Sequence, residues 1–199
     1  MDHDRVLMGK VARREERAFA ELVERFGARL LAVAGRLLRS REDAEDAVQR
    51  AFLRCYTHAA DYRPEWAVST WLYRILTNVC VDEMRRRSAR TAQDPGALDD
   101  HEAAGRNRAA AAPGQHLDLR RALLRVPREA RVLLALRYAD GLTYEELARV
   151  RGISINTVKS QLARGKSILR GALGTGYRDG TSTSSGRASR RMETTDAEP

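Results

Sequence analysis

The chain has 199 residues, of which 43% are apolar and only 6% aromatic, and a formal net charge of +9. This length allows one large or two small domains with buried cores. A net charge this positive indicates a polyanionic partner, either nucleic acid or an anionic membrane surface. No apolar run reaches the roughly 20 residues that span a bilayer, and the opening segment lacks the apolar core of a signal peptide. We therefore expect a cytoplasmic protein without direct membrane insertion.

The excess charge is concentrated in one part of the chain. Residues 115–174 hold 12 basic and 5 acidic side chains, a net charge of +7, whereas residues 1–87 hold 17 and 14. Contacts with phosphate groups are therefore expected mainly in the second of these segments.

Side chains of the kinds that carry catalysis or bind metals are few and scattered. Cys55 and Cys80 form no CxxC pair, so buried thiols in a reducing compartment are favoured over a disulfide. The four histidines fall in termini, loops and linker, and no phosphate loop or nucleophile motif is present. We expect no catalytic residue, metal, cofactor or small-molecule substrate, and hence no enzyme.

The first half of the chain has the spacing of amphipathic helices. Apolar residues three and four apart predict a helix over 15–38, either continuous or broken near Gly27 or Gly35. Ser40 can cap a second helix that runs to about residue 56. Residues 59–70 contain a proline and have no clear period, which predicts a loop.

A third helix is predicted over residues 70–87. The four residues of its expected buried stripe are Leu72, Ile75, Leu76 and Val79. Residues 88–114 contain two prolines, three glycines and an acidic cluster, which are typical of a flexible linker. Helical spacing returns from residue 117 and breaks at Pro127, and the Gly/Ser/Thr-rich tail 175–199 is expected to be disordered. The fold class predicted is all-α: two small helical domains, 1–87 and 115–174, joined by that linker.

The most specific local pattern is a helix-turn-helix between Asp140 and Leu169. Gly141 ends one helix, and Thr143 with Glu146 forms a capping box for the next. Gly152 then provides the left-handed residue at the end of that short helix, and Ser154 caps a longer one.

The long final helix is predicted to have two different faces. Its apolar face consists of Ile155, Val158, Leu162 and Leu169. The opposite face and its flanks carry Asn156, Thr157, Lys159, Ser160, Ala163, Arg164 and Ser167. A helical hairpin with a solvated polar face is the plain alternative. The positive charge and the two caps favour instead a helix that enters the major groove of DNA.

One edge of the third predicted helix also suits nucleic acid. The residues along it are Trp71, Arg74, Asn78, Asp82, Arg85, Arg86 and Arg87. The loop before it adds Tyr62 and Trp66, and aromatic faces beside cations suit unpaired DNA. The alternative, favoured on this segment alone, is that Trp71 belongs to the core and the arginines are solvated.

These motifs together resemble a known family. The stretches AFAELVERFGARLLAVAGRLL, REDAEDAVQRAFLRCY and STWLYRILTNVCVDEMRRR resemble region 2 of the extracytoplasmic-function (ECF) sigma factors. The stretch VPREARVLLALRYADGLTYEELARVRGISINTVKSQLARGKSIL is similar to their region 4. The resemblance covers about residues 14–87 and 115–172, with the motifs in a fixed order.

The resemblance implies a bacterial alternative sigma factor that binds core RNA polymerase and directs promoter-specific transcription initiation. Docking on core polymerase would involve Glu45, Asp46 and Gln49. Recognition of the minus-ten element would involve Trp71, Arg74, Asn78, Asp82, Arg85 and Arg86. Recognition of the minus-thirty-five element would involve Thr143, Asn156, Thr157, Lys159, Ser160 and Arg164. The implied partners are core polymerase, promoter DNA and an anti-sigma factor.

Three positions depart from the family pattern. Arg50 stands where an acid is usual, Gln161 replaces an arginine, and Gly165 replaces an alanine, which is expected to weaken the helix by about 1 kcal/mol.

Two other functions fit parts of the sequence. A stand-alone helix-turn-helix regulator would need a receiver domain of alternating strands and helices, whereas residues 1–87 have a purely helical pattern. A helical adaptor that binds only protein does not account for the charge of residues 115–174.

Overall fold

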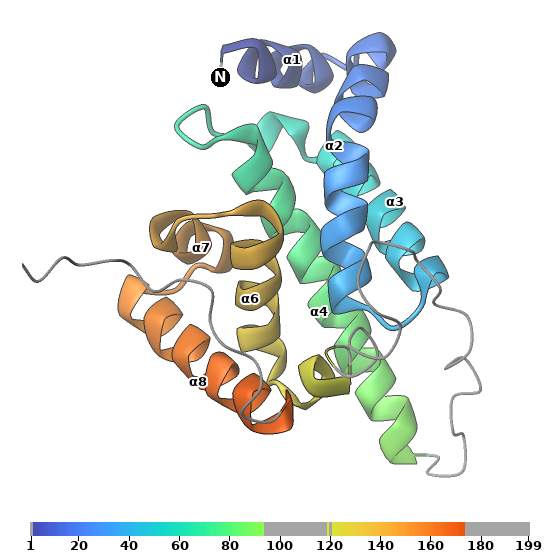
Figure 1. Cartoon of the computed structure of the whole chain (residues 1–199). Coiled ribbons are helices and arrows are strands. Elements are labelled where there is room, and N and C mark those ends of the chain that lie inside the picture. Colours follow the sequence, from blue (N-terminus) through green and yellow to red (C-terminus); the bar gives the residue numbers. More distant parts are fainter. Residues whose placement is uncertain (1, 94–118, 120, 174–199) are drawn as a thin grey trace, which may run out of the picture.

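The structure is a computed structural model and describes residues 2–93, 119 and 121–173 (Figure 1). The secondary structure of these residues is helical, without strands, as the sequence predicted. Most of the expected linker and the whole of the expected tail lie outside the described residues. None of the described helices is long and apolar enough to cross a membrane.

The first group of helices, here called the N-terminal bundle, consists of α1 to α4. Their bounds are α1 Asp2–Ala12, α2 Glu16–Leu37, α3 Arg41–Thr57 and α4 Val68–Gln93, with a short 3₁₀ helix, η1, at Ala59–Asp61. Helix α1 was not predicted from the sequence. It lies across the end of α2 and α4 (Figure 1), where Leu7, Met8 and Val11 are buried and Arg25 binds Asp4 at 2.7 Å.

Helix α2 is continuous through both of its glycines. Helix α3 begins as predicted, because the Ser40 hydroxyl accepts a hydrogen bond from the Asp43 amide at 3.0 Å. Helix α4 is longer than predicted. It extends to Gln93 and so includes residues 88–93, which were expected to belong to the linker. These six residues include no proline or glycine, so nothing local ends the helix before the Pro95 region.

Helix α4 is buried on more than one side. Three residues of the predicted stripe are buried, and Ile75 is partly buried. The buried residues of α4 are Val68, Thr70, Trp71, Leu72, Tyr73, Leu76, Thr77, Val79, Cys80, Val81 and Met84. The helix is thus a central element that packs against α2 and α3 on one side and α6 and α7 on the other.

The second group, here called the C-terminal unit, consists of a helical segment at 121–125 followed by α6 Arg128–Asp140, α7 Tyr144–Arg151 and α8 Ile155–Leu173. The predicted turns are confirmed. Gly141 and Gly152 have φ angles of 70° and 66°, in the left-handed region where glycine is favoured. Both hydrogen bonds of the capping box between Thr143 and Glu146 are present.

Helix α8 packs against α6 through a very close approach. A Cβ atom on Gly165 would lie 2.9 Å from Leu134 Cδ1 and 3.4 Å from Ala130 Cβ. The glycine was expected only to weaken α8, but it also allows the two helices to approach. Val158 and Leu162 are buried as predicted, whereas Ile155 is 37% exposed. As the first residue of α8, Ile155 lies at its end rather than in its packed middle.

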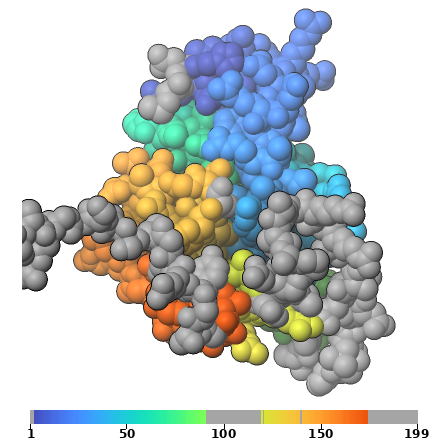
Figure 2. Space-filling view, in the orientation of Figure 1, coloured from blue at the N-terminus to red at the C-terminus, as the bar shows by residue number. Residues whose placement is uncertain are grey.

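The C-terminal unit packs directly on the N-terminal bundle (Figures 1 and 2). Helix α6 lies against α2 and α4, and α7 lies against α4. At this interface Arg29 pairs with Asp140 at 3.3 Å. Met84 Sδ lies 3.7 Å from the guanidinium of Arg131, which also donates to two backbone carbonyls.

The two cysteines are free and buried in the N-terminal bundle. Cys55 lies on α3 and Cys80 on α4, and burial raises the pKa of both thiols to about 12. The expectation of buried thiols is confirmed.

The close approach at Gly165 predicts an unusual response to alanine. Gly165→Ala should give no gain in the free energy of unfolding, because the steric cost against Leu134 offsets the helix propensity gain of about 1 kcal/mol. Gly27→Ala is the matched control, since Gly27 lies inside α2 with nothing within 4 Å of its added Cβ. Equilibrium denaturation followed by circular dichroism measures both. Equal stabilisation by the two substitutions would contradict the packing argument.

Candidate nucleic-acid interface

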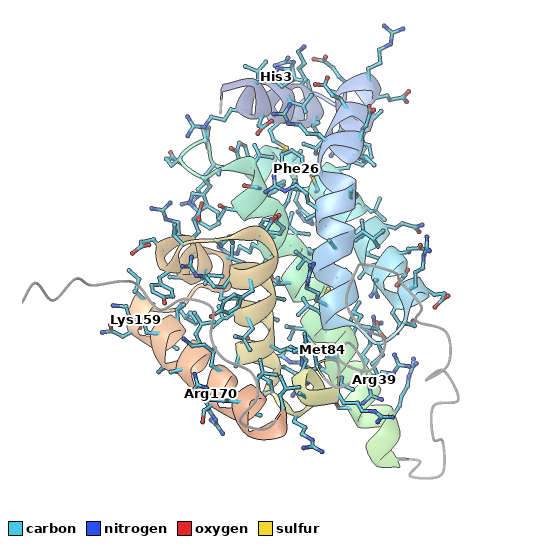
Figure 3. The ribbon with its side chains drawn as sticks, viewed as in Figure 1. His3, Phe26, Arg39, Met84, Lys159 and Arg170 are labelled. Atoms are coloured by element: carbon cyan, nitrogen blue, oxygen red, sulfur yellow. The ribbon has the colours of Figure 1, made fainter. Side chains whose placement is uncertain are left out.

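The predicted polar face of α8 is exposed. Asn156, Lys159, Ser160 and Arg164 are exposed and Thr157 is partly buried. Figure 3 shows Lys159 at the outer end of α8, directed away from the N-terminal bundle. The opposite side of the helix holds the buried residues Val158 and Leu162. The structure thus places all five side chains near one another on the N-terminal half of one helix.

The hydroxyl groups on this face help to set the start of α8. Ser154 Oγ accepts from the Thr157 amide at 3.1 Å and lies 2.9 Å from Thr157 Oγ1. Ser160 Oγ donates to the Thr157 carbonyl at 3.0 Å. Within the part of the chain that the structure describes, no side-chain hydrogen bond or ion pair involves Asn156, Lys159 or Arg164. These side chains can therefore turn toward a ligand.

Thr143 lies on a different element from this face. It is exposed, but its hydroxyl accepts from the Glu146 amide at 3.2 Å, and Glu146 Oε2 accepts from the Thr143 amide at 2.7 Å. Any contact with DNA would have to share the hydroxyl that caps α7.

The predicted edge of α4 is only partly available. Arg74, Asp82, Arg85 and Arg86 are exposed. The Arg74 guanidinium lies 5.2 Å from the centre of the Trp66 ring, and Arg86 pairs with Glu83. Exposed arginines with such weak partners can exchange them for phosphate groups.

Trp71 does not belong to this exposed edge. Trp71 is 9% exposed, and the centre of its ring lies 5.5 Å from that of Tyr62 in an edge-on contact. Tyr62 in turn donates its hydroxyl to the Trp66 carbonyl at 2.6 Å. The alternative that Trp71 is a core residue is therefore the one that the structure supports. The loop before α4, expected to be irregular, contains η1 and is held by these aromatic contacts.

Asn78 is exposed but already has a partner from the C-terminal unit. Arg151, the last residue of α7, donates from Nη1 to Asn78 Oδ1 at 3.2 Å and to Thr77 Oγ1 at 3.4 Å. Its Nη2 pairs with Glu129 of α6. This interaction was not predicted from the sequence, because Arg151 and Asn78 are 73 residues apart and no local pattern links them.

The outer face of α3 holds the third group of predicted residues. Asp46 and Gln49 are exposed, and Glu45 is partly buried with a hydrogen bond from Arg41 at 2.7 Å. Leu53, one turn beyond Gln49, is 63% exposed. Leu53 was not among the residues predicted for this surface, although its position outside the apolar stripe of Val48 and Phe52 was visible in the spacing.

The unusual Arg50 has a structural role. It pairs with Asp46 at 3.0 Å on its own helix and with Glu83 of α4 at 3.2 Å. Arg87 of α4 likewise pairs with Asp43 at the start of α3, at 2.6 Å. These cross-links fix α3 against α4, so the basic residue replaces the usual acid as part of a helix–helix contact.

In the described ranges no group of three or more His, Cys, Asp or Glu residues is placed to hold a metal ion.

Comparisons with known proteins agree with this architecture. Residues 22–90 match the family model "Sigma-70 region 2" and residues 116–169 match "Sigma-70, region 4". The chain is 35% identical over 158 residues to the ECF RNA polymerase sigma factor SigM of Mycobacterium tuberculosis, with coverage of 79% of this chain and 78% of SigM. It is 29% identical over 176 residues to the ECF RNA polymerase sigma-E factor of Escherichia coli, covering 83% and 92%.

Two solved structures have a similar fold. One is the sigma factor RpoE in complex with the anti-sigma factor NepR from Bartonella quintana, with a TM-score of 0.66, 25% identity and coverage of 78% of this chain and 96% of that one. The other is CnrH in complex with the cytosolic domain of CnrY, with a TM-score of 0.62, 24% identity and coverage of 87% and 99%.

The two helical units, matched by the models of sigma-70 regions 2 and 4, define a transcription initiation factor. The chain belongs to the ECF sigma factors. It is an alternative sigma factor that binds core RNA polymerase and directs promoter-specific transcription initiation, the role of this non-catalytic family.

Proposed function

We propose that this sigma factor acts through three surfaces: the outer face of α3, the exposed edge of α4 and the polar face of α8. The observation that supports the proposal most strongly is the two-sided character of α8. Its basic, polar face is exposed, and its other face is buried against α6 and α7. The protein performs no chemistry of its own. It acts in the cytoplasm, beside the polymerase that it directs.

The α8 face is proposed to read the minus-thirty-five element in the major groove. Asn156 and Ser160 have the hydrogen-bonding groups that reach base edges. Lys159 and Arg164 supply cations for the flanking phosphates. Thr143 caps the start of α7, and the Thr157 amide donates to the Ser154 hydroxyl that caps the start of α8.

The α4 edge is proposed to contact the minus-ten element. Arg74, Arg85 and Arg86 are suited to follow the backbone of an opened strand, with Asn78 and Asp82 between them on the same edge. Trp71 supports this surface from beneath through Tyr62. Trp66, which is partly buried, has its ring against Arg74 of this exposed edge.

The α3 face is proposed to dock on core polymerase. Asp46 and Gln49 offer a carboxylate and an amide, and Leu53 adds an exposed apolar side chain on the same side. An exposed large apolar residue beside polar groups is a common feature of protein-binding surfaces.

An anti-sigma factor is proposed as a further partner. The solved relative RpoE is held by the anti-sigma factor NepR, and CnrH by the cytosolic domain of CnrY. We expect such a protein to cover the α3 face and the α8 face together, because both must be free for transcription.

A stand-alone regulator is not favoured. The described residues of the N-terminal bundle contain no strand, so they do not form the receiver domain that this function would need. Run-off transcription with purified core polymerase tests the proposal directly. Tight, sequence-specific footprinting by the isolated chain would instead favour the stand-alone regulator.

The docking proposal predicts a loss of polymerase binding. The double substitution Asp46→Arg with Gln49→Ala should weaken association with core polymerase at least tenfold and leave the circular dichroism spectrum unchanged, because both residues are on the exposed side of α3. Glu24→Arg, an equal charge change on the exposed side of α2, is the control. Unchanged core binding in the double variant would show that polymerase docks elsewhere.

The DNA proposal predicts two different kinds of effect on α8. Arg164→Ala and Lys159→Ala in the holoenzyme should lower promoter affinity for every sequence and reduce the salt dependence by about one unit of slope for each phosphate group that is no longer bound. Asn156→Ala should instead change which upstream sequence is preferred. Filter-binding titrations over a salt series, with a library of upstream elements, measure both effects. A uniform loss with Asn156→Ala would mean that Asn156 only positions the helix.

The anti-sigma proposal predicts a stoichiometric complex in the host. Affinity capture of the chain from unstressed cells should recover one small protein in near-equal amount. The Asp46→Arg variant should recover less of it, because its α3 face is altered. Recovery of polymerase alone, with full activity before any stress, would contradict this proposal.

A further inference from the structure

Helix α1 lies beside the loop that leads into the proposed minus-ten surface. The match to the family model of region 2 begins at residue 22, so the whole of α1, Asp2–Ala12, precedes it. Leu7, Met8 and Val11 of α1 are almost completely buried. Helix α1 packs on η1 and α4 as well as on α2, and Figure 1 shows it across this end of the bundle. A helix buried in this way is a fixed part of the bundle, so it can position the loop beside it.

The loop between α3 and α4, residues 58–67, is held at its first end by Arg14. This residue follows α1 and has a φ angle of 65°, in the left-handed region that residues other than glycine rarely adopt. Its guanidinium donates to the carbonyls of Tyr56 at 2.5 Å and Thr57 at 3.3 Å, and lies 4.6 Å from the centre of the Tyr56 ring. These carbonyls belong to the last turn of α3, where the helix itself offers no donor amide. Arg14 thus ties the connection after α1 to the point where the loop begins.

The middle of the loop is held by Tyr62. Its hydroxyl donates to the Trp66 carbonyl at 2.6 Å, and its ring packs edge-on against that of Trp71. Burial raises the pKa of Tyr62, and the positive charge and hydrogen bond of Arg5 on α1 act in the opposite direction. Because an arginine side chain can only donate, the Tyr62 oxygen accepts from Arg5 while it donates to Trp66. A series of hydrogen bonds therefore runs from α1 into the loop.

This series ends at the residue whose ring lies against the exposed edge of α4. The Arg74 guanidinium is 5.2 Å from the centre of the Trp66 ring. The Trp66 amide donates to the Arg63 carbonyl at 3.0 Å, which closes a turn with Pro64 and Glu65 exposed at its tip. An aromatic ring beside a cation suits an unpaired base. A turn that is fixed before DNA arrives loses less conformational entropy on binding than a loose one.

We propose that Arg5 is a positioning residue for minus-ten recognition. Through Tyr62 it fixes Trp66 beside the exposed edge of α4, and this fixed arrangement lets the sigma factor discriminate between unpaired bases. Arg14 has the same role at the first end of the loop. The proposal rests on the proposed assignment of the α4 edge to the minus-ten element. Arg5 acts through the loop rather than on DNA, because it is partly buried and bonded to Tyr62.

Discrimination between minus-ten sequences is measured with the holoenzyme and single-stranded oligonucleotides randomised at the minus-ten positions. The readout is the ratio between the affinity for the preferred sequence and the average affinity for the library. Arg5→Ala should lower this ratio roughly three- to tenfold, the effect of losing one hydrogen bond to a charged group, and leave core polymerase binding unchanged. A merely destabilised bundle would reduce the active fraction for all sequences equally and leave the ratio as it was. Lys10→Ala, which removes an exposed cation from the same helix, is the matched control and should not change the ratio.

Further variants separate positioning from direct contact with DNA. Tyr62→Phe removes the hydroxyl but keeps the ring against Trp71, and should reproduce the loss of discrimination. In the Tyr62→Phe background, Arg5→Ala should have no additional effect, because the series of hydrogen bonds is already broken. Arg5→Lys keeps a cationic donor and should restore part of the discrimination. Arg14→Gly removes the guanidinium, suits the left-handed φ angle and should also lower the ratio.

The loop itself can be followed without DNA or polymerase. Trp66 and Trp71 are the two tryptophans of the chain, so its intrinsic tryptophan fluorescence reports on this loop and the start of α4. Arg5→Ala should increase the acrylamide quenching constant of the free chain, because Trp66 is then held less firmly, whereas Lys10→Ala should not. Acrylamide is uncharged, so the loss of a cation does not by itself alter the quenching.

The outcomes separate this proposal from the proposed function. An unchanged ratio for Arg5→Ala would overturn the positioning role. An equal further loss in the Tyr62→Phe background would also overturn it and indicate direct contact between Arg5 and DNA. Unchanged quenching would show that Arg5 does not hold the loop. If the unsubstituted holoenzyme had no preference among minus-ten sequences, the proposed function of the α4 edge would fail, and the role of Arg5 in discrimination with it. The quenching would still decide whether Arg5 holds the loop.

Discussion

The packing of both helical units against α4 is the constraint on which the rest of the structure depends. One side of α4 is covered by α2 and α3, and another by α6 and α7. This double coverage explains why Tyr73, Thr77 and Val81 are buried together with the predicted stripe. The exposed edge of α4 is the part of its surface that neither pair of helices contacts. Its position therefore depends on where the C-terminal unit sits.

The local parts of the fold could be predicted from the sequence because their causes are local. Ser40, Thr143 and Ser154 each begin a helix through a hydroxyl that accepts an amide only three residues away. Gly141 and Gly152 end helices because glycine tolerates the left-handed region. These features can be placed without any knowledge of the rest of the chain.

The parts that the sequence did not predict depend on distant residues. Trp71 shares its helix edge with exposed arginines, yet it is buried in the core cluster, where its ring contacts Tyr62. By helix propensity alone, Gly165 only weakens α8. Its role in packing becomes clear from Leu134, which leaves no room for a Cβ atom at this position. Arg50 departs from the family pattern, and its reason is Glu83 on another helix. In each case a residue that is ambiguous by itself is explained by a partner that spacing cannot reveal.

The burial of Cys55 and Cys80 affects how readily the chain can be oxidised. Because burial raises the pKa of both thiols to about 12, little of either is ionised near neutral pH, and the thiolate is the form that peroxides attack. The sequence contains no other cysteine. Peroxide should therefore react slowly with both cysteines for as long as the chain stays folded and keeps them buried.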